Sequence, residues 1–466
     1  MKTRAPLLVA LLVGLLAARL LLAGTTGLVI DEAYYWTWSQ HLAAGYFDHP
    51  PGIAWVIAAS EALFGPTSLG VRATAVLLSV GAIALLLPYA HDRLLLIGLC
   101  AATPLAALGG LVATPDAPLC FGWALALAGA LRGGTGGWLI AGVGAGLAGL
   151  GKYTGWGLWP LLFLGAPREW RRMLPGMVVT LGMIAPNLWW NAAHDWVSLR
   201  FQVHHGLGGG VGATSSAAPG LGGALAFVGA QVGLVGPVVF GAMGAWWTRG
   251  WRGDRAAKLC WWTSLPPVLF FSFAAMFARG EANWAAPAYV GALVGLARAA
   301  ADGHRRVARA AAVGMWMGLA LVALLVVHVY HPLVRLPNDP VARLGEGEGL
   351  AQSVEAWGIT PVYTTRYQEA AALAYYRDVE AYALPGVDRP DQYDLWPIRW
   401  GSPALFVRPY RSGLHLNSDA FCPEHGIPDV DDGGGHVVTE PDGQRWQVYV
   451  VGGCGPGAEE APPPKE

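Results

Sequence analysis

The chain consists mostly of long apolar segments separated by short polar connections. Runs of roughly 17–25 apolar residues are long enough to cross the hydrocarbon core of a bilayer as a helix. Such segments lie near residues 6–29, 68–90, 93–111, 117–131, 137–151, 154–166, 173–190, 223–247, 259–277, 284–299 and 308–330. Those around 117–166 are the shortest and are expected to include broken or tilted helices. The pattern predicts a mainly α polytopic helical bundle with about eleven spans.

The pattern changes near residue 331, where the chain becomes less apolar and richer in Asp, Glu, Pro and Tyr. Strand-like segments at 362–365 and 404–407 lie on either side of a helical segment at 368–376, which favours a small mixed α/β domain. We therefore divide the chain into parts, listed here by residue: a membrane domain at 1–330 with a first exoplasmic loop at 30–67, a C-terminal domain at 331–454, and a disordered tail at 455–466.

Composition supports the membrane assignment. Of the 466 residues, 54% are hydrophobic and only 13% are charged, with a mean hydropathy of +0.41, which is too apolar for a soluble protein of this length. The formal net charge is −1 and no basic run accompanies a soluble module, so no nucleic-acid partner is expected. The sequence predicts a multi-pass protein of the inner (plasma) membrane.

Lysine and arginine set the orientation, because cytoplasmic connections are enriched in them. They gather in alternate connections, at 131–137, 166–173, 248–259 and 298–309. We expect these to be cytoplasmic together with the N-terminus. The opposite, extracytoplasmic face then carries the polar connections at 31–51, 113–118, 191–222 and 279–283, and also the C-terminal domain.

The first apolar run and the cysteines leave alternatives open. The run at 6–29 is interpreted as a retained span, because it is long and lacks a convincing signal-peptide cleavage site. Arg19 within it either reaches for the interface or faces a polar cavity. Cys422 and Cys454 lie in the tail, where an oxidising compartment favours a disulfide over two free thiols.

The most distinctive polar stretch is 31–51, DEAYYWTWSQHLAAGYFDHPP. Its first half places Asp31 and Glu32 at the end of an apolar run, followed by Tyr and Trp residues that suit a short interfacial helix. Its second half ends in two prolines, which hold Asp48 and His49 on a stiff, extended corner. That stiffness suits a ligand position.

Two more signals lie on the same predicted face, and each has a structural alternative. Asp116 stands between two prolines in TPDAP, where it either caps a helix or belongs to a site. Lys152 follows a glycine-rich segment at 142–151 that can pack closely or bend. Its side chain either reaches for the interface or holds a lipid phosphate.

The later connections add cationic and aromatic candidates. His204 and His205 are candidate metal or phosphate ligands, although surface histidine pairs are common. Arg279 either pairs with Glu281 or clamps an anion, and Trp284 could stack on a ring. The nucleotide-type glycine loop, the CxxC pair and the GxSxG elbow are all missing from the sequence, so soluble nucleotide chemistry is unsupported.

These groups fit the transfer of a sugar from a polyprenyl phosphate. The leaving phosphate needs Lys, Arg, His or a metal, and the acceptor hydroxyl needs a carboxylate base. The anomeric carbon must lie near the exoplasmic boundary, where Asp31 ends the first span. In-line displacement separates the base from the cations, so Asp31 is the expected general base.

Several motifs carry a resemblance to a known family: DEAYYW…GYFDHPPG, TPDAP, KYTG, NWAAPAY and, in the tail, RYQEAAALAYY…DQYDLW. They resemble bacterial members of the GT-C glycosyltransferase superfamily, nearest in pattern to glycosyltransferase family 39, with its protein O-mannosyltransferases, lipid A aminoarabinose transferases and RgtA/B/C/D-like neighbours. The resemblance covers about residues 19–397. It implies a GT-C bundle that uses a polyprenyl-phosphate-linked sugar donor and a lipid, glycan or protein acceptor.

The resemblance also implies roles for individual residues. Asp31 falls on the family's catalytic carboxylate with Glu32 beside it, and Asp116 falls on a cavity carboxylate. Asp48 and His49 stand where the aminoarabinose transferase has Glu-Lys, which makes the phosphate contact at His49 pH-dependent. The histidine that shares a metal with that acid falls on His205, so Asp48 and His205 are candidate ligands of a divalent cation. The remaining candidates for substrate binding are Tyr35, Trp36, Tyr46, Lys152, Tyr153, Arg279, Glu281, Asn283 and Trp284.

Two other functions remain open from the sequence. A transporter or flippase of lipid-linked sugars should carry polar residues near the bilayer midplane, and only Arg19 points that way. A catalytically silent bundle that serves a partner enzyme is the other alternative. Acids at the exoplasmic ends of the spans favour the glycosyltransferase.

Overall fold

The computed structural model describes residues 5–207, 220–278, 280–334, 341, 343–401, 403–409, 436–439 and 445–451. Contacts between residues divide the chain into two compact units. The first unit contains α1 and residues 42–334, and the second contains residues 26–41 together with the chain from residue 335. Residues 26–41 thus group with the C-terminal unit, whereas the sequence assigned 26–29 to the first span and 30–41 to the first exoplasmic loop.

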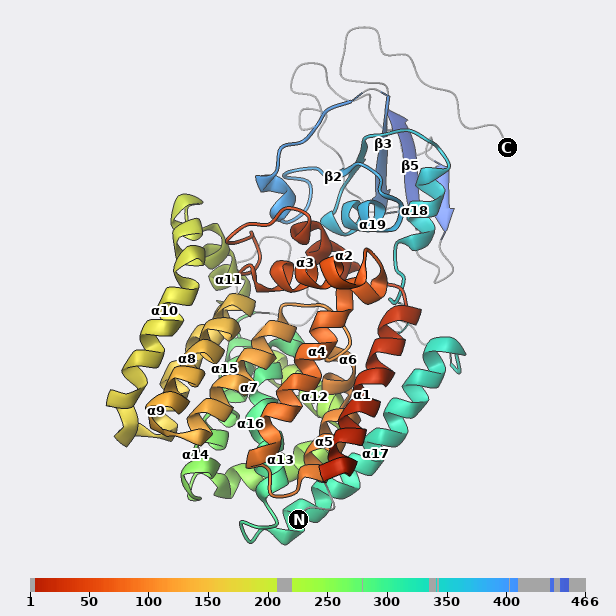
Figure 1. Ribbon diagram of the computed structural model, residues 1–466. Coiled ribbons are helices and arrows are strands. Elements are labelled where there is room, and N and C mark those ends of the chain that lie inside the picture. The colour runs from red at the N-terminus through yellow and green to blue at the C-terminus, as the bar shows by residue number, and fades with distance from the viewer. Residues whose placement is uncertain are drawn as a thin grey trace. The chain divides into compact units, whose positions relative to one another are not determined.

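The first unit is helical throughout its described part (Figure 1). Its helices are α1 (Ala5–Thr25), α3 (Gly52–Phe64), α4 (Ser68–Leu86), η2 (Leu87–Tyr89), α5 (Arg93–Ala102), α6 (Pro104–Gly109), α7 (Asp116–Arg132), α8 (Gly134–Gly151), η3 (Tyr153–Gly157), α9 (Leu158–Gly165), η4 (Pro167–Glu169), α10 (Trp170–Ala193), α11 (Val197–Leu207), α12 (Leu221–Val235), α13 (Pro237–Gly250), α14 (Arg255–Trp262), α15 (Leu265–Ala274), η5 (Ala282–Ala285), α16 (Ala286–Arg298) and α17 (Arg305–Tyr330). Side-chain oxygens cap the N-termini of three of these helices: Thr67 caps α4, Asp92 caps α5 and Asp254 caps α14.

The helices follow the predicted apolar runs, but many are short. By length and hydropathy, four helices in the described ranges could each cross a membrane, or five if one bent pair is counted as a single span. The four are Ala5–Thr25, Ser68–Tyr89, Pro167–Ala193 and Arg305–Tyr330. The expected count of eleven is therefore not confirmed.

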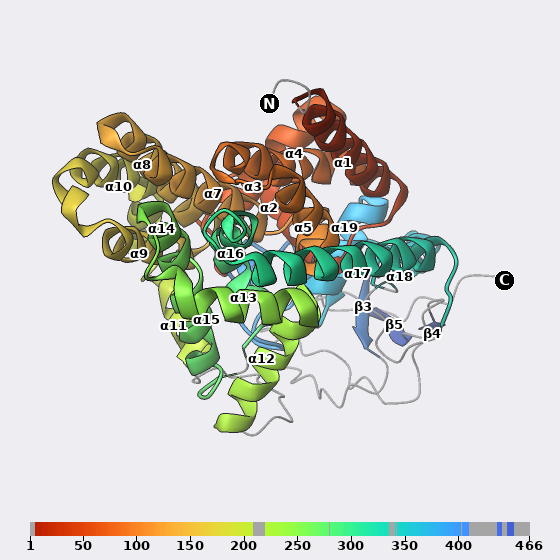
Figure 2. The ribbon, with the colours of Figure 1, turned by 90° about the horizontal axis from the view of Figure 1, so that it is seen from below.

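The predicted span at 223–247 is not one straight helix, because the segment folds as α12 and α13 with a bend of 111° between them (Figure 2). Gly236 at the break has φ +89°, a left-handed value that favours glycine. Pro237 begins α13, and a proline at a first helical position starts a helix but cannot continue the preceding one. Hydropathy sums over this run and does not register the break.

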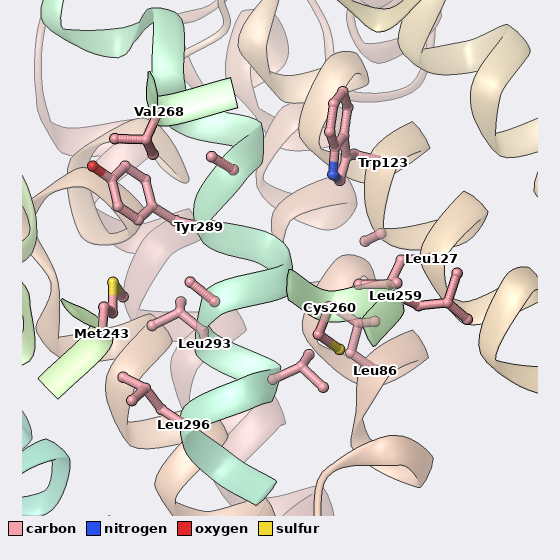
Figure 3. Packing of buried hydrophobic residues seen from close by; sticks show 14 of the residues in the cluster. Leu86, Trp123, Leu127, Met243, Leu259, Cys260, Val268, Tyr289, Leu293 and Leu296 are labelled. Carbon is pink, nitrogen blue, oxygen red and sulfur yellow. The ribbon is translucent and has the colours of Figure 1, made fainter. Parts of the chain in front are cut away.

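Helices α7 and α8 pack closely through glycine. A Cβ atom added at Gly122 of α7 would lie 2.3 Å from the backbone nitrogen of Ala148 in α8, so only glycine permits this approach. The glycine-rich segment at 142–151 therefore packs closely, as its composition predicts. The pair adjoins the main hydrophobic core, where Trp123 and Leu127 of α7 lie with Leu293 and Leu296 of α16 (Figure 3).

Arg19 lies inside the protein, with a relative exposure of 4%. Its guanidinium donates hydrogen bonds to Ser79 Oγ (2.8 Å) and to the carbonyl oxygens of Cys100 (3.2 Å) and Ala106 (2.7 Å). Pro104, four residues after Cys100, has no N–H to offer that carbonyl. Arg19 thus donates to backbone oxygens at the break between α5 and α6. Of the two alternatives for Arg19, the structure supports a position inside the protein and not a side chain that reaches for the interface.

The second unit contains a five-stranded sheet in the order β2-β1-β3-β5-β4. Its strands are β1 (Val362–Thr364), β2 (Ala381–Ala383), β3 (Ala404–Pro409), β4 (His436–Thr439) and β5 (Arg445–Val451), accompanied by α2 (Ile30–Ser39), α18 (Glu348–Glu355), α19 (Tyr367–Arg377) and η6 (Gln392–Leu395). β1 pairs in parallel with β2 and β3, whereas β5 pairs antiparallel with β3 and β4. β1, α19 and β3 lie where the sequence predicts a strand, a helix and a strand.

Side chains alternate across this sheet as the pleat requires. Val362 packs in one cluster with Leu350 of α18 and Leu373 of α19. Its neighbour Tyr363 packs in the other cluster with Phe406. The two faces thus have separate apolar cores.

Candidate active site

Three corners of the chain meet at one end of the first unit: the TPDAP turn, the start of η3, and the loop before α3. A Cβ atom added at Gly151 would lie 2.6 Å from the backbone nitrogen of Leu119, and one added at Gly52 would lie 2.5 Å from the carbonyl oxygen of Leu150. These close approaches bring Asp116, Lys152 and the Asp48–His49 loop to the same end. Figure 1 shows α3 and α11 at this end of the unit and α9 and α14 at the other.

Asp116 is the buried centre of a polar cluster that also includes Lys152 and the more exposed Asn283. Its Oδ1 accepts a hydrogen bond from Lys152 Nζ at 2.7 Å, and its Oδ2 accepts one from Asn283 Nδ2 at 2.7 Å. The side chains of Lys152 and Asp116 are 11% and 12% exposed, so the ion pair is largely removed from water. Asp116 therefore connects α7, the α8–η3 junction and η5, and both of its carboxylate oxygens have partners.

Hydrogen bonds and ring contacts of neighbouring side chains fix the turn that carries Asn283. Gln231 of α12 is fully buried, and its Nε2 donates to the carbonyl oxygen of Ala282 at 3.0 Å. Tyr289, visible in Figure 3, donates from its hydroxyl to Gln231 Oε1 at 2.8 Å. Trp284, next to Asn283, lies against the rings of His205 and Phe271. The amide of Asn283 is thus held toward Asp116 by its neighbours.

The loop that carries Asp48 is held through its main chain. Side chains of α10 and α11 donate hydrogen bonds to every second carbonyl oxygen along it: Asn187 Nδ2 to Ala44 (2.9 Å), Ser198 Oγ to Tyr46 (2.5 Å) and Gln202 Nε2 to Asp48 (2.6 Å). The loop bends at residues 47–49, where the Tyr46 N–H donates to the His49 carbonyl oxygen at 3.2 Å, so it is not the extended corner that the prolines predicted. We call this set of three hydrogen bonds the carbonyl clamp.

The side chains of this loop differ in exposure. Asp48 is buried at 4% exposure, and His49 is half-buried. Tyr46 is fully buried, and its hydroxyl accepts a hydrogen bond from the Ala43 N–H at 3.0 Å. Burial raises the pKa of Tyr46 to about 12, so its phenol stays protonated at neutral pH. Tyr46 can position a ligand but cannot act as a base there.

Sequence reasoning missed the two asparagines of α10. Asn191 Nδ2 donates to the Tyr153 hydroxyl at 3.0 Å, and Asn187 belongs to the carbonyl clamp. Both residues are almost completely buried, at 0% and 1% exposure, respectively. Their signal was present, since Asn187 lies inside the predicted span at 173–190 and Asn191 directly after it, four residues on and thus on the same helix face.

Asp31, Glu32, Tyr35 and Trp36 lie on α2 in the second unit. Glu32 is fully buried, and its Oε2 accepts a hydrogen bond from the Val29 N–H at 2.9 Å, which satisfies a free donor at the start of α2. Asp31 is exposed, Tyr35 and Trp36 are half-buried. Glu32 thus caps one N–H at the start of α2.

The motif around α2 and the tail motif of α19 pack together within the second unit. The ring of Tyr34 lies 4.2 Å from that of Tyr367, and its hydroxyl accepts a hydrogen bond from the Gln392 N–H at 2.8 Å. The Trp36 ring contacts Tyr375 at 5.2 Å. These contacts explain why both motifs are aromatic.

The expected metal ligands do not form a complete donor set. His204 and His205 are exposed on α11, and His205 stacks on Phe201. Within the described ranges, no group of three or more His, Cys, Asp or Glu side chains could hold a metal ion. Asp48 and His205 would supply two protein ligands to a divalent cation, and the donor phosphate and water would have to complete its coordination. We derive no chemical step through a metal.

The remaining candidates are placed as follows. Glu281 is exposed and precedes η5 as its N-cap residue. Arg279, Cys422 and Cys454 lie outside the described residues.

The apolar helices and the buried polar end of the first unit define an integral membrane protein with a candidate site at the ends of its helices. Residues 48–190 match a family model described as dolichyl-phosphate-mannose-protein mannosyltransferase. Lipid A galacturonosyltransferase RgtD of Rhizobium johnstonii is 35% identical over 289 residues. That match covers 57% of this chain and 59% of RgtD. The resemblance to GT-C glycosyltransferases is confirmed.

Solved structures agree on the fold. ArnT from Cupriavidus metallidurans matches with a TM-score of 0.64 in the apo state and in the state bound to undecaprenyl phosphate, at 16% and 18% identity. Each match covers 96% of this chain and 98% of ArnT. The fold of the chain is therefore that of ArnT over almost its whole length.

Proposed function

We propose that the protein is a membrane glycosyltransferase that moves a sugar from a polyprenyl-phosphate donor to an acceptor hydroxyl, with inversion, on the exoplasmic face of the inner membrane. The buried Lys152–Asp116 pair at the end of the membrane helices carries this proposal, because an ammonium at the end of a membrane helix is suited to meet a lipid phosphate. The names of the relatives support the donor class. RgtD is named for lipid A galacturonosyl transfer, and one ArnT structure holds undecaprenyl phosphate.

In this proposal the phosphate is held by Lys152 and His49. The Lys152 ammonium has three N–H groups, and Asp116 accepts from one of them. The others can donate to the leaving phosphate, where developing charge is best stabilised by donors already in place. Asp116 and Asn283 then act as positioning residues that fix the lysine. His49 adds a positive charge only when it is protonated.

The acceptor side is assigned to Asp31. A general base must take the acceptor proton from the face opposite the phosphate, so it should be separate from the cations. Asp31 is exposed in the first turn of α2, whereas Glu32 beside it is buried and accepts a hydrogen bond from the Val29 N–H. We therefore assign the base to Asp31 and a structural role to Glu32.

No observation favours the transporter. Arg19 is the mid-span charge that suggested a transporter. Its guanidinium donates hydrogen bonds to Ser79 and to carbonyl oxygens at the α5–α6 break. The acceptor is proposed to be a lipid of the lipid A type, by analogy with the printed name of RgtD. Glycan and protein acceptors are tested in the same assay as this lipid acceptor.

The proposal is tested with full-length protein in lipid nanodiscs. The protein is incubated with polyprenyl phosphates carrying labelled galacturonate, aminoarabinose or mannose, and with lipid A, oligosaccharide or peptide acceptors. We expect one donor to give a labelled product whose anomeric configuration, determined by NMR, is opposite to that of the donor. If no pair gives a product, and reconstituted vesicles instead move the labelled lipid between leaflets, the transporter replaces the enzyme.

A further inference from the structure

A groove lies at the end of the first unit opposite Asp116, where α9 ends and α14 begins. It has a volume of about 400 Å³ and is lined by Leu164, Pro167, Trp251, Lys258, Trp261 and Trp262 among others. The connections that form it are rich in Arg and Lys, which assigns this end to the cytoplasmic side. The groove takes no part in the candidate active site.

The acidic residues near this end are already paired. Glu169 Oε1 accepts from Arg255 Nε at 2.5 Å, and its Oε2 accepts from Trp138. Asp254 caps α14 and pairs with Arg298 at 2.8 Å. No carboxylate lines the groove in the described part of the chain. The positive charge facing it is therefore not neutralised by the residues that surround it.

Lys258 is the cation inside the groove. It is exposed, and its side chain makes no hydrogen bond or ion pair with any residue that the structure describes. Arg252 follows Trp251, a lining residue of the groove, and its guanidinium lies 4.5 Å from the centre of the Trp251 ring. An ammonium and a guanidinium that no carboxylate neutralises are suited to binding an anion.

The other walls of the groove are apolar and suited to the membrane interface. Trp261 donates from its indole nitrogen to the Trp247 carbonyl oxygen at 2.7 Å, which fixes its ring, and Trp262 packs against it. Tryptophan prefers the headgroup level of a bilayer. Next to the groove, Phe163 and Leu164 of α9 are 45% and 43% exposed, so apolar surface continues from the groove along the helix.

We propose that this groove binds the phosphodiester headgroup of an anionic glycerophospholipid from the cytoplasmic leaflet. The headgroup oxygens meet Lys258 and Arg252, the glycerol lies among the tryptophans, and the acyl chains follow the exposed surface of α9. Basic pockets between membrane helices on the cytoplasmic side recognise headgroups in this way. A free phosphate lacks the chains that the apolar walls require.

The test is native mass spectrometry of the full-length protein, released from micelles that contain equal amounts of phosphatidylglycerol and phosphatidylcholine. The wild-type protein should retain phosphatidylglycerol in preference. Lys258→Gln should weaken its retention about fivefold, since a lysine near an anionic lipid surface contributes roughly 1 kcal/mol. Lys258→Arg should retain it, and millimolar inorganic phosphate should not displace it.

The matched control is Arg306→Gln, which removes an exposed cation from the same predicted face at the start of α17. It should leave phosphatidylglycerol retention unchanged. Equal retention of the two lipids by the wild-type protein, or equal losses in Lys258→Gln and Arg306→Gln, would overturn the proposal. Displacement by inorganic phosphate would reassign the groove to a soluble anion. Sugar transfer is measured separately and is expected to be unchanged in all three variants.

Discussion

The Lys152–Asp116 pair makes a quantitative prediction about stability. At 2.7 Å, two unit charges attract by about 6 kcal/mol when the effective dielectric constant is ~20. Moving both ions out of water costs several kcal/mol each, so the net contribution of the intact pair is small. Removing one partner leaves the other buried without compensation, which costs about 3–5 kcal/mol. The pair should therefore look far more important in single variants than in a double variant.

We expect Asp116→Asn to lower the free energy of unfolding by about 3 kcal/mol, because it leaves the Lys152 ammonium buried beside a neutral amide. Lys152→Gln should have a similar effect. The double variant Asp116→Asn/Lys152→Gln should lose at least about 2 kcal/mol less than the sum of the single losses, as expected for two residues in direct contact. The free energies are measured by unfolding with SDS in mixed micelles.

Asp92→Asn is the matched control. Asp92 is an exposed aspartate at a helix start, where Asn also caps well, so this change should stay within about 0.5 kcal/mol. If the two single losses at Asp116 and Lys152 are below about 1 kcal/mol, or if they simply add in the double variant, the pair is not a buried structural unit. Lys152 would then be reassigned as a solvated interface residue.

Four further predictions follow from the site and the second unit. Asp31→Asn should lower turnover by roughly 10²–10⁴-fold with donor affinity unchanged, and a folded variant with full turnover would remove Asp31 from the mechanism. Gln202→Leu breaks the carbonyl clamp at Asp48 and should weaken donor binding, measured as KM, more than it lowers kcat; an unchanged KM would show that the clamp does not position the loop. Burial raises the pKa of the Glu369 carboxyl above its ordinary 4.5, although Arg366 opposes this, so its contribution to stability falls as pH rises from about 4.5. Glu369→Gln should remove that slope, and parallel unfolding curves from pH 4 to 8 for the variant and the wild type would contradict it. Exhaustive chelation should lower turnover if Asp48 and His205 share a divalent cation, whereas full activity after chelation would leave the cationic role to the side chains.

The apolar runs predicted the positions of the helices well, because a helix that crosses the hydrocarbon core of a bilayer must be apolar. The runs at 6–29 and 308–330 fold as Ala5–Thr25 and Arg305–Tyr330. The same runs did not predict where helices break, because hydropathy averages over Gly236 and Pro237. The grouping of α2 with the C-terminal unit was also invisible, since it depends on ring contacts such as Tyr34 with Tyr367, whose partners lie more than 300 residues apart.

The candidate site could likewise be predicted from the sequence only in part. The sequence identified Asp116 and Lys152 as separate signals on one face, and their pairing required α7 and α8 to approach through Gly122. The carbonyl clamp was missed because its acceptors are backbone oxygens, which leave no trace in the residue types at Ala44, Tyr46 or Asp48. Arg19 was recognised as an unusual charge within a span. Its hydrogen bond to the Cys100 carbonyl oxygen, at the break before Pro104, depends on tertiary structure and could not be predicted.

The carbonyl clamp has a consequence for how such a protein can diversify. Every amino acid carries the carbonyl group that the clamp grips, so a mutation at position 44, 46 or 48 keeps the three hydrogen bonds. Evolution can thus exchange the chemical groups displayed by this loop while its course stays fixed. A library randomised at positions 48 and 49, with Asn187, Ser198 and Gln202 left intact, is therefore a rational starting point for altering donor preference.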